Sequence, residues 1–190
     1  CMACHVPNDN SQNQKGYTPP AIKLSSDVMT PEVLWSFGRI GNVSVSPDGS
    51  KAVYDITYFN KEEDRGYSDL YLMNLPEGQT TRLTDTDYNE SDAGWTPDGK
   101  FITYLAKGQL WEMNPDGSNP RQVTDIPDGI NGYVYAPDMS KIVYLKDVQL
   151  EPTVQDLYPD LPKAKARIVD DQFYRHWNDW VDAYTHLFIA

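Results

Sequence analysis

The sequence predicts an all-β protein, a β-propeller built from four-stranded antiparallel blades. Three observations predict it: a Pro-Asp-Gly type turn that recurs between short strands, a second half-motif that recurs forty residues apart, and a suitable composition. The 190 residues include 14 Pro, 12 Gly and 13 Tyr, which are residues typical of turns and of strands. Apolar residues make up 39% of the chain, enough to bury a core.

The first half-motif is a strand, a turn and a second strand, and it occurs three times, over residues 43–54, 93–104 and 133–144. Its turns are Pro47-Asp48-Gly49, Pro97-Asp98-Gly99 and Pro137-Asp138-Met139. Proline presets φ, aspartate caps the turn through its side chain, and glycine supplies a positive φ. Because Met139 takes the place of glycine, we expect a changed turn in the third copy.

The second half-motif consists of a third strand and a Thr-Asp pair that follows it. Leu70-Tyr71-Leu72-Met73-Asn74 with Thr84-Asp85 recurs as Leu110-Trp111-Glu112-Met113-Asn114 with Thr124-Asp125. Two half-motifs at this period indicate propeller blades, which we expect to begin near residues 40, 90 and 130. Since a closed ring needs at least about four blades, we expect an incomplete propeller of about three blades, completed by a longer polypeptide or another chain.

The chain divides by composition into residues 1–27, a flexible polar tether, and residues 28–190, the partial propeller. A short helix is expected at the start of the second part, over residues 30–35. Thr30 is its predicted N-cap, Pro31 occupies its first position and Gly38 ends it. We expect Leu34, Trp35 and Phe37 to pack on the rim of the propeller.

The two cysteines, Cys1 and Cys4, precede His5 and have the C-x-x-C-H spacing of covalent haem attachment. The polar residues that follow offer no helical pocket for a porphyrin, so we favour another hypothesis. Cys1 resembles the acylated cysteine of a mature bacterial lipoprotein, which predicts a periplasmic or outer-membrane location. The alternative is that the two cysteines only mark where the sequence starts.

The net charge of −12 argues against nucleic acid as a partner and against an electrostatic grip on anionic lipid. The sequence has no P-loop, no dinucleotide fingerprint and no clustered His/Cys set for zinc. We therefore expect no cofactor and no metal.

An insertion at about residues 147–184 separates the second and third strands of the third blade. Long structured loops in compact domains are often functional, and this one concentrates aromatic, acidic and basic residues. The candidates for substrate-facing residues are Arg175, His176, Asp179 and Asp182. The alternative is a structural clip, in which Trp177 and Trp180 are buried and Arg175 pairs with Asp171 or Asp179.

The chain resembles the prolyl oligopeptidase family of serine peptidases (S9-type), with bacterial dipeptidyl-peptidase and acylaminoacyl-peptidase-like members closest. The resemblance covers about residues 28–190 and rests on the Pro-Asp-Gly blades, on Leu161-Pro162-Lys163-Ala164 and on Tyr174-Arg175-His176-Trp177-Asn178-Asp179-Trp180. It implies a propeller that precedes an α/β-hydrolase domain carrying Ser, Asp and His, and that gates access of short peptides to that domain.

No G-x-S-x-G nucleophile elbow occurs in this chain, so we assign it no catalytic residue and expect the hydrolase domain to lie outside it. Whether it is enzymatic therefore depends on a full-length peptidase. Dipeptidyl members of the family hold the substrate amine with a pair of glutamates. The corresponding dipeptide here, Glu62-Glu63, is expected in a solvated hairpin loop. The alternative function is a non-enzymatic Tol-B or WD-like binding propeller of the bacterial envelope.

Overall fold

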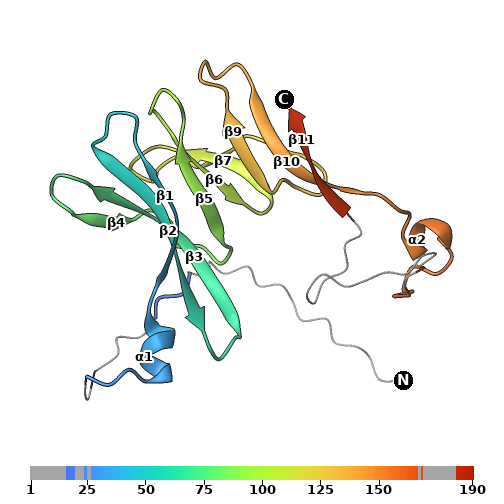
Figure 1. Cartoon of the computed structure of the whole chain (residues 1–190), viewed down its shortest axis with the longest axis horizontal. Helices are drawn as coiled ribbons and strands as arrows, with labels where there is room; N and C mark the ends of the chain where they lie inside the picture. The colour runs from blue at the N-terminus through green and yellow to red at the C-terminus, as the bar shows by residue number, and fades with distance from the viewer. Residues whose placement is uncertain (1–15, 20–23, 25–26, 167, 169–182) are drawn as a thin grey trace. The chain divides into compact units, whose positions relative to one another are not determined.

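A computed structural model describes residues 16–19, 24, 27–166, 168 and 183–190. In this part the chain forms strands β1 to β11 and two short helices, α1 and α2 (Figure 1). It divides into two compact units, residues 1–125 and residues 126–190. Among the described residues, neither helix has the length and apolar character needed to cross a membrane.

The first sheet of the first unit consists of four consecutive antiparallel strands in the order β1-β2-β3-β4. Their bounds are β1 Arg39–Val45, β2 Lys51–Asn60, β3 Arg65–Asn74 and β4 Thr80–Arg82. β2 and β3 stay in register from Lys51↔Asn74 to Asn60↔Arg65. This is the first predicted blade, called blade one below.

The second sheet, called blade two, repeats this order as β5-β6-β7-β8. Its strands are β5 Glu90–Trp95, β6 Ile102–Ala106, β7 Gln109–Met113 and β8 Arg121–Gln122. Both blades carry a register shift at the same place in their first strand, between Ile40 and Val43 and between Ser91 and Gly94. The all-β class and the four-stranded antiparallel blades are therefore confirmed.

The Thr-Asp repeat has a structural cause. The Thr84 hydroxyl oxygen accepts a hydrogen bond from the Leu70 backbone N–H at 2.8 Å, and Thr124 accepts one from Leu110 at 2.9 Å. Each threonine thus satisfies a strand amide after the short fourth strand ends. Because a buried amide without a partner is costly, the threonine recurs in both blades.

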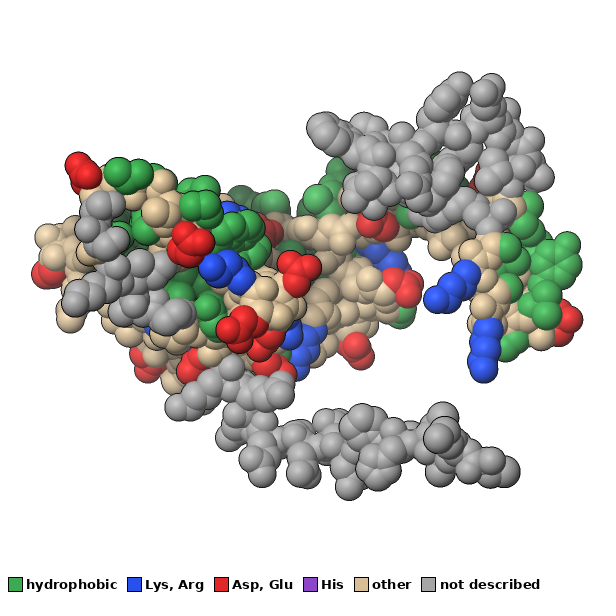
Figure 2. Space-filling model, turned by 90° about the horizontal axis from the view of Figure 1, so that it is seen from below, with side chains coloured by type: hydrophobic (Ala, Val, Ile, Leu, Met, Phe, Trp, Pro, Cys, Tyr) green, Lys and Arg blue, Asp and Glu red, His purple; other side chains and the backbone are tan. Residues whose placement is uncertain are grey.

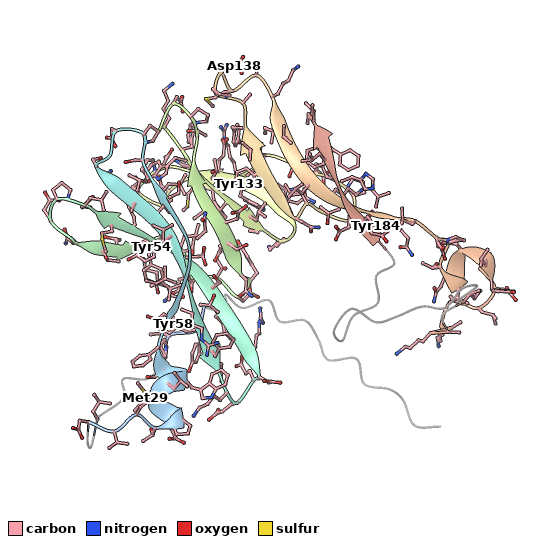
Figure 3. The ribbon with its side chains drawn as sticks, in the orientation of Figure 1. Met29, Tyr54, Tyr58, Tyr133, Asp138 and Tyr184 are labelled. Carbon is pink, nitrogen blue, oxygen red and sulfur yellow. The ribbon has the colours of Figure 1, made fainter. Side chains whose placement is uncertain are left out.

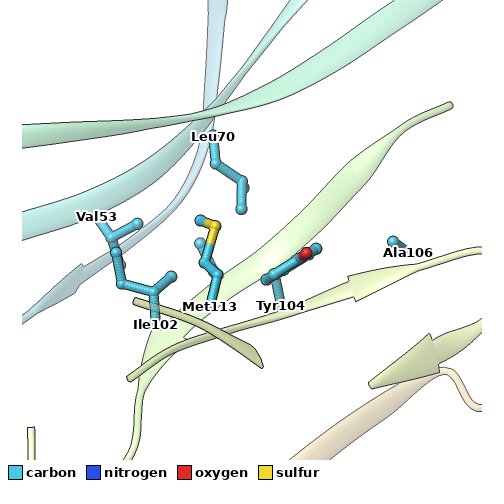
Figure 4. Close-up of a cluster of buried hydrophobic side chains, with 7 residues drawn as sticks. Val53, Leu70, Ile102, Tyr104, Ala106 and Met113 are labelled. Atoms are coloured by element: carbon cyan, nitrogen blue, oxygen red, sulfur yellow. The ribbon is translucent and has the colours of Figure 1, made fainter. Parts of the chain in front are cut away.

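The core of the first unit lies between blades one and two. Its buried residues are Val53, Leu70, Ala93, Ile102, Tyr104, Ala106 and Met113, most of them drawn in Figure 4. Val53 and Leu70 come from blade one, and Ile102, Tyr104 and Met113 come from blade two. Apolar side chains on one face of each sheet therefore pack against each other between the two blades.

The second unit contains a three-stranded antiparallel sheet in the order β11-β10-β9. Its strands are β9 Gly132–Tyr135, β10 Ile142–Gln149 and β11 Ala183–Ile189. The first strands of the three sheets begin at Arg39, Glu90 and Gly132, close to the predicted starts. Residues 185–190, expected to hold the third strand of the third blade, overlap β11 up to Ile189, and the Phe188 ring of this strand stacks on Tyr144 at 5.4 Å.

The prediction of a changed turn in the third copy is wrong. Met139 has φ +58°, in the same left-handed region as Gly49 at +73° and Gly99 at +71°. Its N–H donates to Ala136 O at 2.8 Å, as the two glycines donate to their counterparts. Asp138, at the tip between β9 and β10 (Figure 3), accepts from the Ser140 N–H at 3.0 Å. Strand pairing thus holds Met139 in a left-handed conformation, which costs about 1–2 kcal/mol for a residue with a side chain.

Helix α1 spans Pro31–Ser36, with Thr30 as N-cap and Pro31 at its start, as predicted. The Trp35 ring lies 5.6 Å from the Phe59 ring at the end of β2, and the Arg39 guanidinium lies over both rings. Leu34 and Phe37 remain about half exposed. Of the three residues expected to pack on the rim, Trp35 therefore makes the clearest contact.

Candidate substrate-facing site

The insertion leaves and re-enters the three-stranded sheet of the second unit at a single place. β10 and β11 pair from Val143↔Ile189 to Gln149↔Ala183, so the residues between Gln149 and Ala183 form one excursion from neighbouring strands. Tyr184, labelled in Figure 3, lies near the start of β11, at the base of the insertion. The strand pairing thus brings the two ends of the insertion together.

Charged side chains at the base of the insertion are held by contacts with neighbouring residues. The Asp147 Oδ1 atom accepts from the Thr185 hydroxyl at 2.5 Å, and hydrogen bonds from Thr185 and Asn131 hold the pKa of Asp147 below its usual value. The Lys146 ammonium lies 3.5 Å from the Asp128 carboxylate. These groups can bind polar atoms of a ligand, but they include no activated nucleophile.

The first part of the insertion folds locally. Thr153 and Asp156 form a capping box at the start of α2, Val154–Leu157, which the sequence analysis did not predict. Backbone hydrogen bonds from Leu161 to Tyr158 and from Ala164 to Leu161, each 2.9 Å long, hold the Leu161-Pro162-Lys163-Ala164 motif in successive turns. This motif is therefore a structured part of the insertion.

This part of the insertion exposes apolar side chains. Figure 2 shows hydrophobic groups gathered on the α2 segment, with basic side chains nearby. Its large exposed hydrophobic residues are Leu150, Leu157, Tyr158, Leu161 and Ile168. Exposed apolar surface of this kind is typical of a contact with another protein part.

The predicted substrate-facing residues Arg175, His176, Asp179 and Asp182 lie outside the described residues, as do Trp177, Trp180 and Cys1. In the chain, Asp182 directly precedes Ala183, which pairs with Gln149 at the base of the insertion. Among the described residues, no group of three or more His, Cys, Asp or Glu could hold a metal ion.

The Glu62-Glu63 dipeptide lies in the four-residue turn between β2 and β3, as predicted for a solvated loop. The Asn60 side chain accepts from the Glu62 N–H at 3.0 Å, and the Tyr67 hydroxyl donates to Glu63. Both glutamates are exposed. The described contacts thus bind this turn to its own hairpin.

A shallow hollow of about 190 Å³ lies between the turns of blades one and two, bordered by Lys51, Trp95 and Pro115 among others. The turn aspartates Asp48 and Asp98 accept hydrogen bonds from hydroxyl and backbone groups of their own turns. The Ser46 hydroxyl for Asp48, and the Lys100 ammonium followed by the Thr96 hydroxyl for Asp98, are the main causes that lower the pKa of each carboxyl to about 2. Both carboxylates therefore stabilise their own turns.

A group of buried polar residues in the first unit was not predicted from the sequence. Asp69 on β3 is buried and binds Arg82 at 2.7 Å, and Arg82 also binds Asp85 at 2.9 Å. Glu90, at the start of β5, is 1% exposed. Burial is the largest influence on this carboxyl and raises its pKa to about 7. The signal in the sequence was a glutamate at a position where the other two copies have isoleucine.

Comparisons with known proteins give a consistent result. The chain is 37% identical over 176 residues to dipeptidyl-peptidase 5 of Porphyromonas endodontalis, which covers 90% of this chain and 26% of that protein. It is 36% identical over 177 residues to dipeptidyl-peptidase 5 of Porphyromonas gingivalis, covering 91% of this chain and 26% of that protein. The chain thus spans about a quarter of the length of these relatives. No protein-family model matches it.

The fold is also similar to a solved structure. The acylaminoacyl peptidase of Pyrococcus horikoshii matches with a TM-score of 0.58 and 16% identity, covering 80% of this chain and 23% of that one. At this identity the match supports the fold alone.

Proposed function

We propose that this chain, which belongs to the prolyl oligopeptidase (S9-type) family, is part of the substrate-gating propeller of a peptidase that cleaves short peptides. The observation that carries the proposal is the 37% identity over 90% of the chain to a dipeptidyl-peptidase. The alternative, a non-enzymatic binding propeller, is less supported because both of these relatives are peptidases.

In this proposal the chemistry takes place outside the chain. A serine attacks the scissile carbonyl, a histidine accepts its proton, and an aspartate orients the histidine. All three belong to an α/β-hydrolase domain elsewhere in the full-length polypeptide. This chain restricts access to that domain and contributes contacts through the insertion.

The insertion provides groups suited to a peptide substrate. The planar guanidinium of Arg175 matches a carbonyl or carboxylate of a peptide. The carboxylate of Asp179 or Asp182 matches a free N-terminal amine, and His176 is a further candidate for a polar contact. The pairing of β10 with β11 supports this role, since it fixes both ends of the insertion on one sheet.

The test is kinetic and uses the full-length protein with a dipeptidyl chromogenic substrate. Arg175→Ala and Asp179→Ala are each expected to lower kcat/KM at least tenfold, or about 1.4 kcal/mol of transition-state stabilisation, with an unchanged melting temperature. Lys165→Ala and Asp160→Ala remove exposed charges from the described part of the insertion and serve as matched controls. Both controls should leave kcat/KM unchanged.

Two outcomes would contradict separate parts of the proposal. A lower melting temperature with unchanged kinetics in the Arg175 and Asp179 variants would mean that the insertion is a structural clip. Failure of the full-length wild type to hydrolyse any dipeptidyl or acylaminoacyl substrate would overturn the peptidase function itself.

We also propose that Cys1 carries a lipid that holds the protein at the bacterial envelope. A cysteine followed by the polar residues 8–14 supports this proposal. In the native bacterium, Cys1→Ser is expected to abolish both palmitate labelling and partition into the membrane fraction, whereas Cys4→Ser should retain both. Membrane partition of Cys1→Ser at the wild-type level would show that the anchor is elsewhere.

A further inference from the structure

A glutamate occupies a position of the repeat that is otherwise isoleucine. Glu90 pairs with Ala106 at the start of β5, and its counterpart Ile40 pairs with Ile56 at the corresponding place in β1. In the third copy of the sequence the same position is Ile130. The blade fold therefore does not require an ionisable group here.

The carboxyl of Glu90 is held by the segment that leads from blade one to blade two, residues 83–89, called the inter-blade crossing. Its Oε1 atom lies 2.7 Å from the Thr86 hydroxyl oxygen, and its Oε2 atom lies 3.3 Å from that of Thr84. The crossing is bound to β3 by the Thr84 contact with Leu70 and by Asn89, which accepts from the Ser68 N–H at 3.1 Å. Glu90 thus joins the crossing to blade two.

The contacts of the Thr86 hydroxyl with two oxygen atoms favour a proton on Glu90. The Thr86 hydroxyl oxygen is 2.8 Å from the Tyr88 carbonyl oxygen and 2.7 Å from Glu90. An ionised carboxylate only accepts hydrogen bonds, so the single Thr86 hydrogen would have to serve two acceptors. A protonated Glu90 instead donates to Thr86, which donates to Tyr88, and every group is satisfied.

The charges nearby also oppose ionisation. Arg82 is already bound to two carboxylates, Asp69 and Asp85. Burial raises the pKa of Glu90 to about 7. The Thr86 hydrogen bond opposes this shift, and the negative charge of Asp69 adds to it. Other ionisable or charged groups around this site are Asp87 and Tyr88 in the crossing, Tyr104 on β6, and Lys107, whose ammonium lies over the Tyr88 ring.

The outer side of the crossing carries the N-terminal segment Gly16–Thr18. A Cβ atom added to Gly16 would lie 2.7 Å from the Thr86 carbonyl oxygen, so the two backbones are in close contact. Thr18 accepts from Arg82 at 3.1 Å, and the Tyr17 ring lies 5.6 Å from the Tyr67 ring. Thr86 therefore contacts Glu90 through its hydroxyl and the N-terminal segment through its carbonyl.

We propose that Glu90 is a proton-operated latch: when protonated it fastens the inter-blade crossing to blade two, and its ionisation loosens the crossing together with the N-terminal segment that lies on it. Every residue of this latch lies in the first unit. The latch is independent of the peptidase assignment.

The direction of the pH effect follows from proton binding. The unfolded chain releases the Glu90 proton near the ordinary value of 4.5, whereas the folded chain keeps it to about pH 7. Between these values the folded state binds more protons, so stability falls as the pH rises. The stabilisation is complete below about pH 4.5 and is lost through pH 7. The unfolding equilibrium constant should rise by up to about tenfold per pH unit in this window.

The test is urea unfolding of the full chain between pH 5 and pH 8. Glu90→Gln is uncharged and keeps a donor for Thr86. Between pH 5 and pH 8 its unfolding constant should therefore rise at least tenfold less than that of the wild type. Glu112→Gln is the control, because Glu112 is also buried in the first unit but binds Arg121 at 2.5 Å. It should keep the wild-type pH dependence between pH 6 and pH 8. Equal pH dependence in wild type and Glu90→Gln would overturn the latch.

A second measurement needs only the wild type. Carbon-13 NMR of the glutamate carboxyl carbons should show one buried carboxyl that titrates near pH 7. Hydrogen exchange of the amides of residues 16–18 and 83–89, corrected for its intrinsic pH dependence, should accelerate across that midpoint. Titration of every glutamate near pH 4.5, or corrected exchange that does not change with pH, would contradict the proposal.

Discussion

Replacing Leu70 with alanine is expected to lower the free energy of unfolding by about 3–4 kcal/mol, within the range found for fully buried leucines. Leu70 is 0% exposed and lies in the core between blades one and two (Figure 4). Its removal leaves a cavity beside residues of both sheets, which cannot close without moving one sheet toward the other. Urea unfolding of the full chain measures the effect.

The matched control is Leu75→Ala. Leu75 follows β3 in the same blade and is 42% exposed, so its truncation should change the free energy of unfolding by no more than about 0.5 kcal/mol. A loss below about 1 kcal/mol for Leu70→Ala would mean that blades one and two are not packed through this core.

Replacing Arg82 with methionine is expected to cost about 3 kcal/mol, because it leaves the carboxylate of Asp69 buried without its cation. The Asp69 side chain is 2% exposed and binds Arg82 at 2.7 Å. Burial raises the pKa of Asp69, and Arg82 opposes that shift. Without Arg82 the pKa rises further, so the deficit should grow as the pH rises and shrink in acid, where a protonated Asp69 needs no cation.

The double variant Arg82→Met with Asp69→Asn separates the lost charge pair from lost packing. It removes the buried charge as well as its partner and should recover part of the stability, with a weaker pH dependence. Lys100→Met is the control, because Lys100 pairs with Asp98 on the surface and exposed pairs contribute about 0–1 kcal/mol. An Arg82→Met deficit that does not depend on pH would show that packing, and not charge, is what Arg82 supplies.

The predictions that proved correct depend on neighbouring residues. The Pro-Asp-Gly turns, the short strands on either side of them and the Thr30-Pro31 start of α1 are short-range signals, and each produced the expected element. The capping box at Thr153 is an equally local signal that also begins a helix. Such signals are reliable because turn dihedrals, caps and strand alternation are set within a few residues.

The burial of Glu90 was missed because it depends on the packing of blade one against blade two. Thr84 and Thr86 lie only six and four positions before Glu90, but nothing in the sequence shows that their hydroxyl groups reach its carboxyl. An insertion at about residues 147–184 was expected between two strands of the third blade, but the exact pairing at its base, Gln149 with Ala183, joins residues 34 positions apart and was not predicted. Burial and ion pairing of this kind arise only when sheets pack against one another.

By itself the sequence determined the blades of this protein, because strand, turn and capping preferences act locally and recur in each copy. Only the tertiary structure decided the third turn and the state of Glu90. Pairing of Tyr135 with Ile142 holds Met139 in a left-handed conformation that its side chain disfavours. Packing of blade one on blade two removes the Glu90 carboxyl from water, and the loss of hydration is what shifts its pKa.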